Sequence, residues 1–173
     1  MAKNALEKAM DFLAMRPLTE RELRSKLQLS GRYSLEDIDE AVSLCRTRGY
    51  LNDELLAADA AQFLNSGGRG RGMIRKKLRA RGVPEPALEQ ALEAVSPEAE
   101  LEAARNAAEG KLRLLIREKD AGKKREKLFR FLISRGFSPD LSGRIIREKI
   151  FAKESDSSEG FAENFSDEES TVF

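Results

Sequence analysis

Three segments of this chain of 173 residues share one pattern, in which two aliphatic residues four positions apart are followed four positions later by a glycine. The segments are 23–27 with Gly31, 74–78 with Gly82 and 128–132 with Gly136. Their starting positions differ by 51 and then by 54 residues. A unit that recurs at a period of this size indicates a tandem array. Because the units of such an array contact mainly their neighbours, we expect an elongated molecule with a long surface rather than a pocket.

Apolar residues recur at spacings of three and four along the chain, and no stretch alternates with a period of two. The first pattern is typical of amphipathic helices and the second would indicate strands. We therefore predict an all-α protein of nine helices, arranged as three tandem three-helix repeats in an elongated, curved array. The predicted repeats span residues 1–51, 52–96 and 97–151, and an acidic tail follows at 152–173.

Local signals predict where several helices begin and end. Thr19 with Glu22 three positions later is a capping box, so a helix is expected to start at Thr19. Asp53, together with Asn52, is expected to cap the fourth helix rather than to contact a partner. The glycine-rich segment 67–72 is expected to be a flexible connection, and the helix that opens near Pro97 is expected to reach about Lys119.

The composition limits the cellular compartment and the membrane association that can be expected of the protein. Cys45 is the only cysteine, so an intramolecular disulfide is impossible and a reducing cytoplasm is expected. Cys45 shares an apolar stripe with Ile38 and Val42, which favours a buried, inert thiol. No run of about 18 apolar residues is present, so no membrane span is expected. The first four residues lead directly into an amphipathic pattern without the apolar block of a signal peptide.

The formal net charge of +1 conceals a strong asymmetry. From residue 152 onward the only basic residue is Lys153. The acidic residues there are Glu154, Asp156, Glu159, Glu163, Asp167, Glu168 and Glu169. The tail therefore carries −6 and residues 1–151 carry +7, which indicates a basic body that meets a polyanion. The composition of the tail predicts disorder. Its three spaced phenylalanines would either dock on a partner or belong to a tail that only aids solubility.

Four motifs occur in order along the predicted repeats. They are Ala5-Leu6…Leu13…Arg16 with Thr19-x-x-Glu22-Leu23-x-x-Lys26-Leu27, Arg48-Gly49-Tyr50-Leu51-Asn52-Asp53, Gly72-x-Ile74-x-x-x-Leu78-x-x-x-Gly82, and Arg135-Gly136-Phe137-Ser138. Together they resemble the RecX family of bacterial regulators of the RecA recombinase, over roughly residues 4–151. The resemblance implies three tandem three-helix repeats that bind along the groove of the RecA–DNA filament. It also implies inhibition of recombination and DNA repair, by capping, disassembly or blocking of the filament.

Between Asp59 and Glu85 the sequence holds no acidic residue. The cations of this window are Arg69, Arg71, Arg75, Lys76, Lys77, Arg79 and Arg81. In a helix that begins near residue 72, Ile74 and Leu78 would face a core and the cations would face solvent. Such a face suits phosphates or an acidic protein groove, although it would also serve as ordinary solvated charge. The preceding glycines would let backbone N–H groups bind an anion at the helix N-terminus, unless they are only a linker.

A second group of cations lies later in the chain. Its members are Lys111, Arg113, Arg117, Lys119, Lys123, Lys124, Arg125, Lys127 and Arg130. Glu118, Asp120 and Glu126 are interspersed among them, so pairing within the helices competes with binding. Those predicted to join the first group in binding the filament or its phosphates are Lys123, Lys124, Arg125 and Lys127.

Aromatic residues near these groups have two interpretations. Phe129 and Phe131 lie beside basic residues and could stack on bases, or they could pack within the protein. Tyr50 and Leu51 follow a glycine that ends a helix, so both are expected to pack back on that helix rather than to contact a partner.

The sequence argues against an enzyme. It has no histidine, one cysteine and no phosphate-binding Gly-Lys-Ser/Thr loop, so we expect no catalysis, no cofactor and no metal. The expected partners are the RecA filament and single- or double-stranded DNA through its phosphates; no membrane is expected, and the protein should be a monomer. The alternatives are a helical nucleic-acid-binding protein that acts alone and a plain helical scaffold. Segment 73–81 has no Asn or Gln, which favours phosphate contact over base readout. Replacing four cations of this segment with Glu is expected to remove inhibition of the recombinase and to leave the helical content intact. The four are Arg75, Lys76, Arg79 and Arg81.

Overall fold

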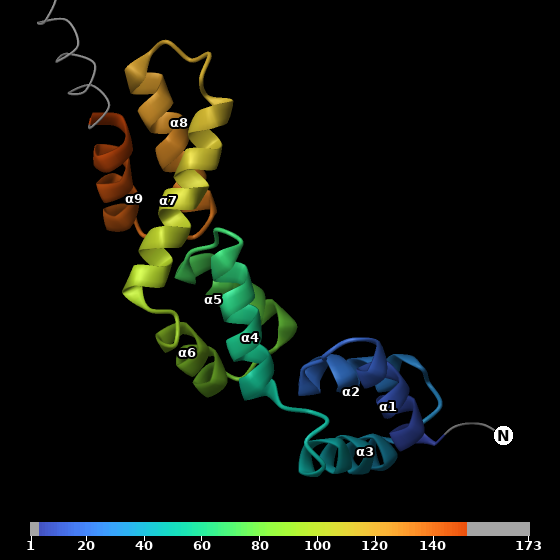
Figure 1. The fold of residues 1–173 in the computed structure, drawn as a ribbon. Helices are drawn as coiled ribbons and strands as arrows, with labels where there is room; N and C mark the ends of the chain where they lie inside the picture. Colours follow the sequence, from blue (N-terminus) through green and yellow to red (C-terminus); the bar gives the residue numbers. More distant parts are fainter. Residues whose placement is uncertain (1–3, 152–173) are drawn as a thin grey trace, which may run out of the picture.

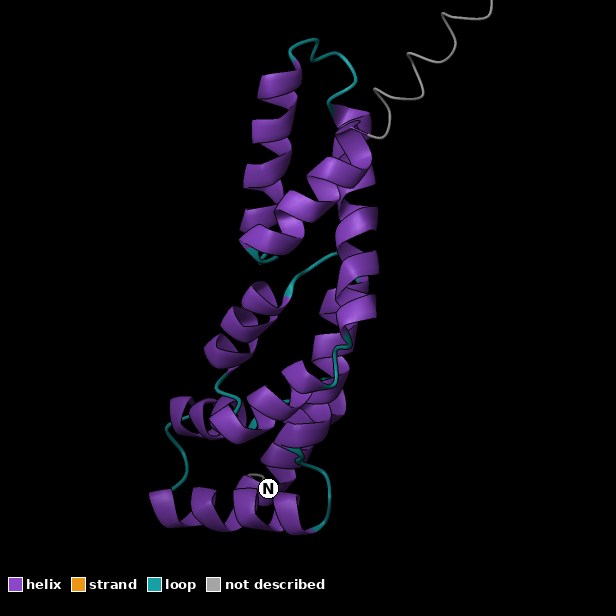
Figure 2. Ribbon diagram, turned by 90° about the vertical axis from the view of Figure 1, so that its left-hand side faces the viewer, coloured by secondary structure: helices purple, strands orange, loops and turns teal. Residues whose placement is uncertain are grey.

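The computed structural model describes residues 4–151, and this part of the chain is helical throughout, without a strand (Figure 2). Its helices are α1 (Ala5–Met15), α2 (Glu20–Leu29), α3 (Leu35–Thr47), α4 (Asp53–Ser66), α5 (Arg71–Arg81), α6 (Glu85–Glu93), α7 (Pro97–Leu114), α8 (Ala121–Ser134) and α9 (Pro139–Ile146), followed by a π-helical turn, η1 (Arg147–Phe151). The all-α class is confirmed, whereas η1 was not predicted. In this part of the chain no helix is long and apolar enough to cross a membrane. The predictions for the tail at 152–173 lie outside the described residues.

Each successive set of three helices encloses an apolar core of its own. We call α1–α3 repeat 1, α4–α6 repeat 2, and α7–α9 with η1 repeat 3. Among the described residues no buried apolar cluster spans two repeats. The repeats follow one another along a bent line, with α7 leading from repeat 2 into repeat 3 (Figure 1). The predicted elongated array of three-helix repeats is therefore confirmed.

The recurring sequence pattern has a structural cause in each repeat. Its aliphatic residues, Leu23, Leu27, Ile74, Leu78, Leu128 and Leu132, are completely buried. The glycine that follows takes a left-handed backbone conformation, with φ of 64° at Gly31, 80° at Gly82 and 85° at Gly136. A residue with a side chain is strained in this conformation, so glycine recurs where the chain leaves the middle helix of each repeat.

The capping prediction holds at Thr19 and fails at Asp53. The Thr19 hydroxyl accepts a hydrogen bond from Glu22 N at 3.1 Å, and the Glu22 carboxylate accepts one from Thr19 N at 3.0 Å. At the start of α4 the cap is Asn52, whose side chain accepts from Leu55 N at 2.9 Å. Asp53 is the first residue of the helix itself, because the chain leaves its extended conformation only after Asn52.

The helix α7 is shorter than predicted, because it ends at Leu114 rather than near Lys119. Residues 115–120 turn the chain instead. Asp120 then caps α8 by accepting a hydrogen bond from Lys123 N at 3.0 Å.

The glycine-rich segment is an ordered turn, so the predicted flexible connection is wrong. Gly67 ends α4, Gly68 has a φ of 71° and Gly70 is the N-cap of α5. Gly70 N donates to the Arg135 carbonyl oxygen of repeat 3 at 2.9 Å. A Cβ on Gly70 would lie 2.5 Å from the Gly136 carbonyl oxygen, so the missing side chain lets two backbones touch.

Candidate polyanion-binding surface

The helix α5 carries the cations of the first predicted group and lies in the middle of the array (Figure 1). Its Ile74 and Leu78 are fully buried in the core of repeat 2, as their spacing predicted. Lys76 and Lys77 lie between them in sequence and are exposed. The burial of one stripe therefore turns the remaining side chains of the helix toward solvent or toward neighbouring helices.

Two arginines of α5 pair with acids of the next helix. Arg75 Nη2 lies 2.8 Å from Glu89 Oε2, and the Arg79 guanidinium donates to the Glu85 carboxylate. The hydrogen bond from Arg79 lowers the pKa of Glu85 and outweighs the opposing effect of burial. All four side chains are substantially exposed, and such pairs contribute little to stability.

Two further arginines of α5 reach neighbouring repeats. Arg81 Nη2 lies 2.9 Å from Glu22 Oε2 of repeat 1. Arg71 Nε lies 3.2 Å from Glu100 Oε2 of repeat 3, and its Nη2 donates to the Val95 carbonyl oxygen. These two arginines sit at the two ends of α5, where they connect repeats.

The N-terminus of α5 is already occupied by groups of the protein. Arg71 N donates to Glu100 Oε1 at 2.9 Å, and Gly72 N donates to the Gly136 carbonyl oxygen at 3.0 Å. An anion was predicted to bind at this helix end, and in the structure the anion there is the carboxylate of Glu100 in repeat 3. A phosphate would have to displace it, so this helix end offers no open anion site.

The cations of the first group that remain are Arg69, Lys76 and Lys77. Arg69 donates to the Gly67 carbonyl oxygen at 3.1 Å. Lys76 and Lys77 form no ion pair with any residue in the range 4–151. They are therefore the side chains of α5 whose charge is most directly available to an external anion.

The second group of cations surrounds the turn between α7 and α8, at the end of the array farthest from repeat 1 (Figure 1). Lys127 Nζ lies 2.5 Å from Glu118 Oε2, and this bond lowers the pKa of Glu118. Lys123 approaches Asp120 at 3.9 Å, and Arg125 also has an internal partner. Lys124 has no ion-pair partner within the described chain.

The same turn exposes two aliphatic side chains that sequence analysis did not single out. Leu114 is 78% exposed and Ile116 is 79% exposed, between the exposed cations Arg113 and Arg117. The helical spacing gave no signal for this, because α7 was expected to continue through both residues. An apolar pair between cations suits an acidic surface that also offers an apolar contact.

The predictions for Tyr50, Leu51 and the two phenylalanines have different outcomes in the structure. Tyr50 is 54% exposed, so the expectation that it packs on its helix is wrong, whereas Leu51 is buried as expected. Phe131 is partly buried, and both Lys111 Nζ and the Arg135 guanidinium lie over its ring, at 5.4 and 4.8 Å from the ring centre. Phe129 is 37% exposed and remains open to contact.

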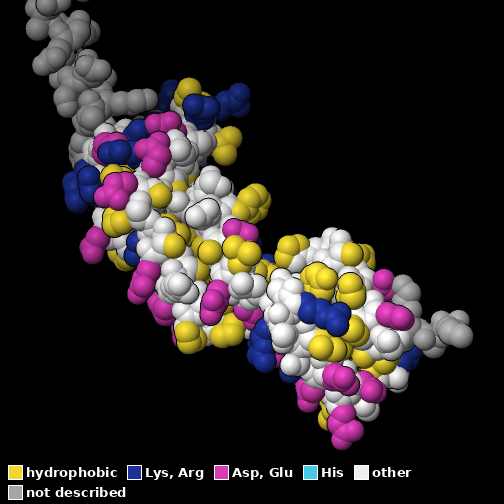
Figure 3. Space-filling model, turned by 60° about the horizontal axis from the view of Figure 1, so that its bottom comes forward, with side chains coloured by type: hydrophobic (Ala, Val, Ile, Leu, Met, Phe, Trp, Pro, Cys, Tyr) yellow, Lys and Arg dark blue, Asp and Glu magenta, His cyan; other side chains and the backbone are white. Residues whose placement is uncertain are grey.

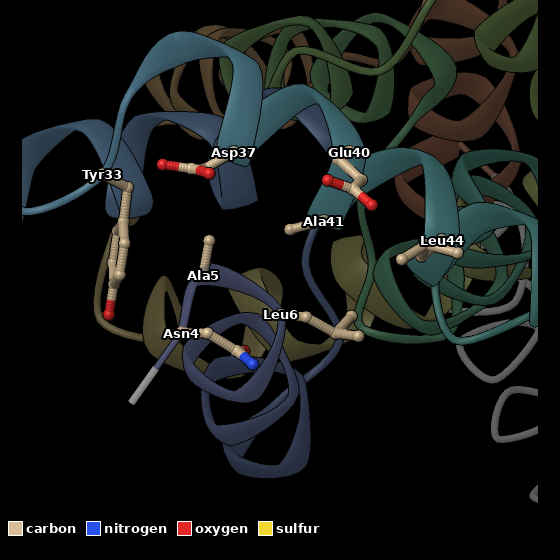
Figure 4. Close-up of a pocket in the computed structure, with 8 residues that line it drawn as sticks. All are labelled: Asn4, Ala5, Leu6, Tyr33, Asp37, Glu40, Ala41 and Leu44. Atoms are coloured by element: carbon tan, nitrogen blue, oxygen red, sulfur yellow. The ribbon is translucent and has the colours of Figure 1, made fainter. Parts of the chain in front are cut away.

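Two hollows lie away from α5. One, of about 290 Å³, opens between α1 and α3 with Asp37 and Glu40 on its rim (Figure 4). Asp37 is engaged by Ser34 in the capping box of α3, so this hollow does not present a ready set of ligands. The other, of about 590 Å³, lies between α8 and α9 and is lined in part by Phe129 and Ile146.

On the face drawn in Figure 3, basic and acidic side chains lie intermixed along the array. The predicted cations are therefore brought to two places, α5 and the α7–α8 turn, and many are neutralised by acids from other helices. Within residues 4–151 no group of three or more acidic or cysteine side chains is arranged to hold a metal ion. The exposed cations at these two places suit an extended anionic surface, and the two hollows described above are open to solvent.

Comparisons with known proteins agree with this architecture. Residues 5–43 match the family model described as RecX, first three-helix domain, and residues 98–146 match RecX, third three-helix domain. A Regulatory protein RecX of Vibrio campbellii is 36% identical over 134 residues, covering 78% of this chain and 84% of that protein. The protein of the same name in Haemophilus influenzae is 29% identical, covering 81% of this chain and 91% of the relative.

Other relatives are longer. The Regulatory protein RecX of Caldanaerobacter subterraneus is 34% identical over 79% of this chain, but the match spans 66% of that relative. In one from Clostridium perfringens the match spans 60% of the relative. Two solved structures share the fold, with TM-scores of 0.71 and 0.74 and sequence identities of 24% and 23%. They are described as a regulatory protein RecX, with 86% of this chain and 70% of that one covered, and as RecX from Lactobacillus salivarius, with 83% and 93% covered.

Proposed function

Because the chain belongs to the RecX family of regulatory proteins, we propose that it inhibits a RecA recombinase by lying along the RecA–DNA filament. Binding there would limit recombination and DNA repair within the cytoplasm. The protein acts in this proposal as a monomer and without catalysis of its own. The names of the relatives support a regulatory role, and the specific target follows the resemblance of the sequence motifs.

The proposal is supported by the shape of the molecule together with the cations that have no ion-pair partner among the described residues. Three separate cores arranged in a line expose a long surface. Lys76 and Lys77 lie near its middle, and Lys124 lies near its far end with Leu114 and Ile116. An extended set of contacts of this kind suits a polymer, because a polymer can meet the middle and the end of the array at once.

The experiment is an ATPase assay of a RecA recombinase on single-stranded DNA with added protein. Lys76→Gln with Lys77→Gln removes two unpaired charges and breaks no ion pair of the described chain. We expect the concentration needed for half-inhibition to rise about tenfold, which corresponds to about 1.4 kcal/mol of binding free energy. The matched control is Arg32→Gln with Arg48→Gln, two exposed cations of repeat 1.

The control variant should inhibit as strongly as the unmodified protein. Equal inhibition by the lysine variant and the unmodified protein would refute the assignment of α5 as a contact surface. Failure of the unmodified protein to inhibit at any concentration would refute the proposed function itself. In that case, tight binding of bare DNA would favour the alternative of a nucleic-acid-binding protein that acts alone.

A further inference from the structure

We infer that the ion pair between Glu22 and Arg81 fixes the direction in which repeat 1 leaves the rest of the array. Both residues would then be positioning residues for polymer binding, a consequence that rests on the proposed function. The direction of repeat 1 is a property of the chain alone and can be measured without any partner.

The junction between repeats 1 and 2 is built from polar groups. The Thr19 hydroxyl donates to the Arg81 carbonyl oxygen at 2.7 Å, and Arg21 Nη2 donates to the Ala80 carbonyl oxygen at 2.7 Å. The N-terminal end of α2 therefore covers carbonyl groups that the C-terminal end of α5 leaves without helical partners. The described apolar clusters stay within their own repeats, so burial of apolar surface does little to hold this junction.

The side chain of Arg81 makes the most directional contact of this junction. Its Nη2 donates to Glu22 Oε2 at 2.9 Å and its Nε to Glu22 Oε1 at 3.2 Å, so the guanidinium and the carboxylate meet through two parallel bonds. The same Nη2 also donates to the Pro17 carbonyl oxygen at 3.1 Å. Two parallel charged bonds restrict the relative orientation of the groups they join, which a single contact cannot do.

A further contact joins the same two repeats on the side of α4. Asp53 Oδ1 accepts a hydrogen bond from Glu20 N at 2.9 Å. The chain itself connects the two repeats just before Asp53, so repeat 1 would rotate about this point. Arg81 lies away from it and restricts that rotation. Without the Arg81 side chain, the contacts that remain are Asp53 to Glu20 N and the bonds to the carbonyl groups that end α5.

The junction between repeats 2 and 3 is of a different kind. Gly70 and Gly72 each donate a backbone hydrogen bond to the 135–136 segment, and a Cβ on Gly136 would lie 2.1 Å from Met73 N. Two backbone hydrogen bonds and the close approach of two backbones at these glycines restrict rotation of one repeat against the other. Loss of one side chain would therefore loosen the first junction and leave the second in place.

The test measures the distance between repeats 1 and 2 in the full chain. Spin labels are attached to cysteines introduced at Ser43 on α3 and Gln90 on α6, which are both exposed. Cys45 is completely buried and stays unlabelled. Pulsed electron paramagnetic resonance then gives the distribution of label distances for each variant.

Arg81→Gln should give a broader distribution with a shifted maximum. Glu22→Gln should do the same, although glutamine can still cap α2 as glutamate does. The control is Arg79→Gln, which removes an arginine of the same helix that pairs within repeat 2, and its distribution should equal that of the unmodified protein. An unchanged distribution in Arg81→Gln and Glu22→Gln would overturn the inference.

The same variants separate this inference from the proposed function. Lys76→Gln with Lys77→Gln should weaken filament inhibition and leave the distance distribution unchanged. Arg81→Gln should change both. A protein that inhibits no recombinase, but in which Arg81→Gln changes the distances, would refute the proposed function and retain the positioning role of the pair within the chain.

Discussion

The carboxylate of Glu22 accepts hydrogen bonds from Thr19 N and from the guanidinium groups of Arg16 and Arg81. Burial raises the pKa of Glu22, but the bonds from Arg81, Thr19 N and Arg16 together lower it more, from 4.5 to about 2. Nearby, burial raises the pKa of Asp53, as do the charges of Glu20 and Glu22, and the hydrogen bond from Glu20 N only partly offsets this. One junction thus holds two carboxyl groups whose pKa values move in opposite directions.

The lowered pKa of Glu22 predicts an acid-sensitive contribution to stability. The folded state keeps Glu22 charged more strongly than the unfolded state does, so this contribution is present above about pH 4.5 and is lost as the pH falls toward about 2. Its size is at most about 3 kcal/mol, and less because the side chain is partly exposed. The measurement is urea unfolding of the unmodified protein and of Glu22→Gln, at about pH 6 and at about pH 3.

Glu22→Gln should lower the free energy of unfolding at about pH 6, and should lower it by about half as much or less at about pH 3, where folded Glu22 has begun to lose its charge. Asp53→Asn is the opposite control, because a raised pKa makes charged Asp53 unfavourable near neutral pH. It should lose less stability at about pH 6 than at about pH 3. An equal effect of Glu22→Gln at both values would show that the charge of Glu22 does not stabilise the fold.

At the scale of the helices, most starting points could be predicted because capping is local. Thr19 and Glu22 are three residues apart, and both sides of the capping box form as their spacing predicts. The partners of α5 could not be predicted, because Glu22 is 59 residues from Arg81 and Glu100 is 29 residues from Arg71. Arginines from a stretch of sequence without acids thus pair in the folded chain with acids of three other helices, α2, α6 and α7.

Replacement by alanine should have opposite effects on stability at two glycines, one where α5 meets the α8–α9 turn and one on the surface of α7. Gly70→Ala forces a Cβ to within 2.5 Å of the Gly136 carbonyl oxygen, so we expect a loss of about 1–3 kcal/mol of stability from overpacking. Gly110 lies within α7, and a Cβ there would meet no atom within 4 Å. Gly110→Ala should therefore stabilise the protein, by about 0.5–1 kcal/mol.

Thermal unfolding of both glycine variants checks this prediction. A Gly70→Ala protein as stable as the unmodified one would mean that the two backbones can separate without cost. It would also remove the contrast between the two junctions of the array.

For the whole molecule, the spacing of the three aliphatic pairs and glycines was sufficient to predict a tandem, elongated array. The direction of each repeat was not predictable, because it depends on a bidentate ion pair at one junction and on glycine contacts at the other. The surface available to a partner was predicted only in part. Lys76 and Lys77 have no ion-pair partner among the described residues, whereas the exposed Leu114 and Ile116 follow from the early end of α7.

The proposed partner of the protein is a RecA filament, and neither free recombinase nor bare DNA alone. The most direct measurement compares the affinity of the full chain for a RecA filament on single-stranded DNA, for free recombinase and for bare DNA, at one salt concentration. We predict tight binding to the filament and much weaker binding to either component. Comparable affinity for bare DNA and for the filament would refute the proposal that the filament is the partner.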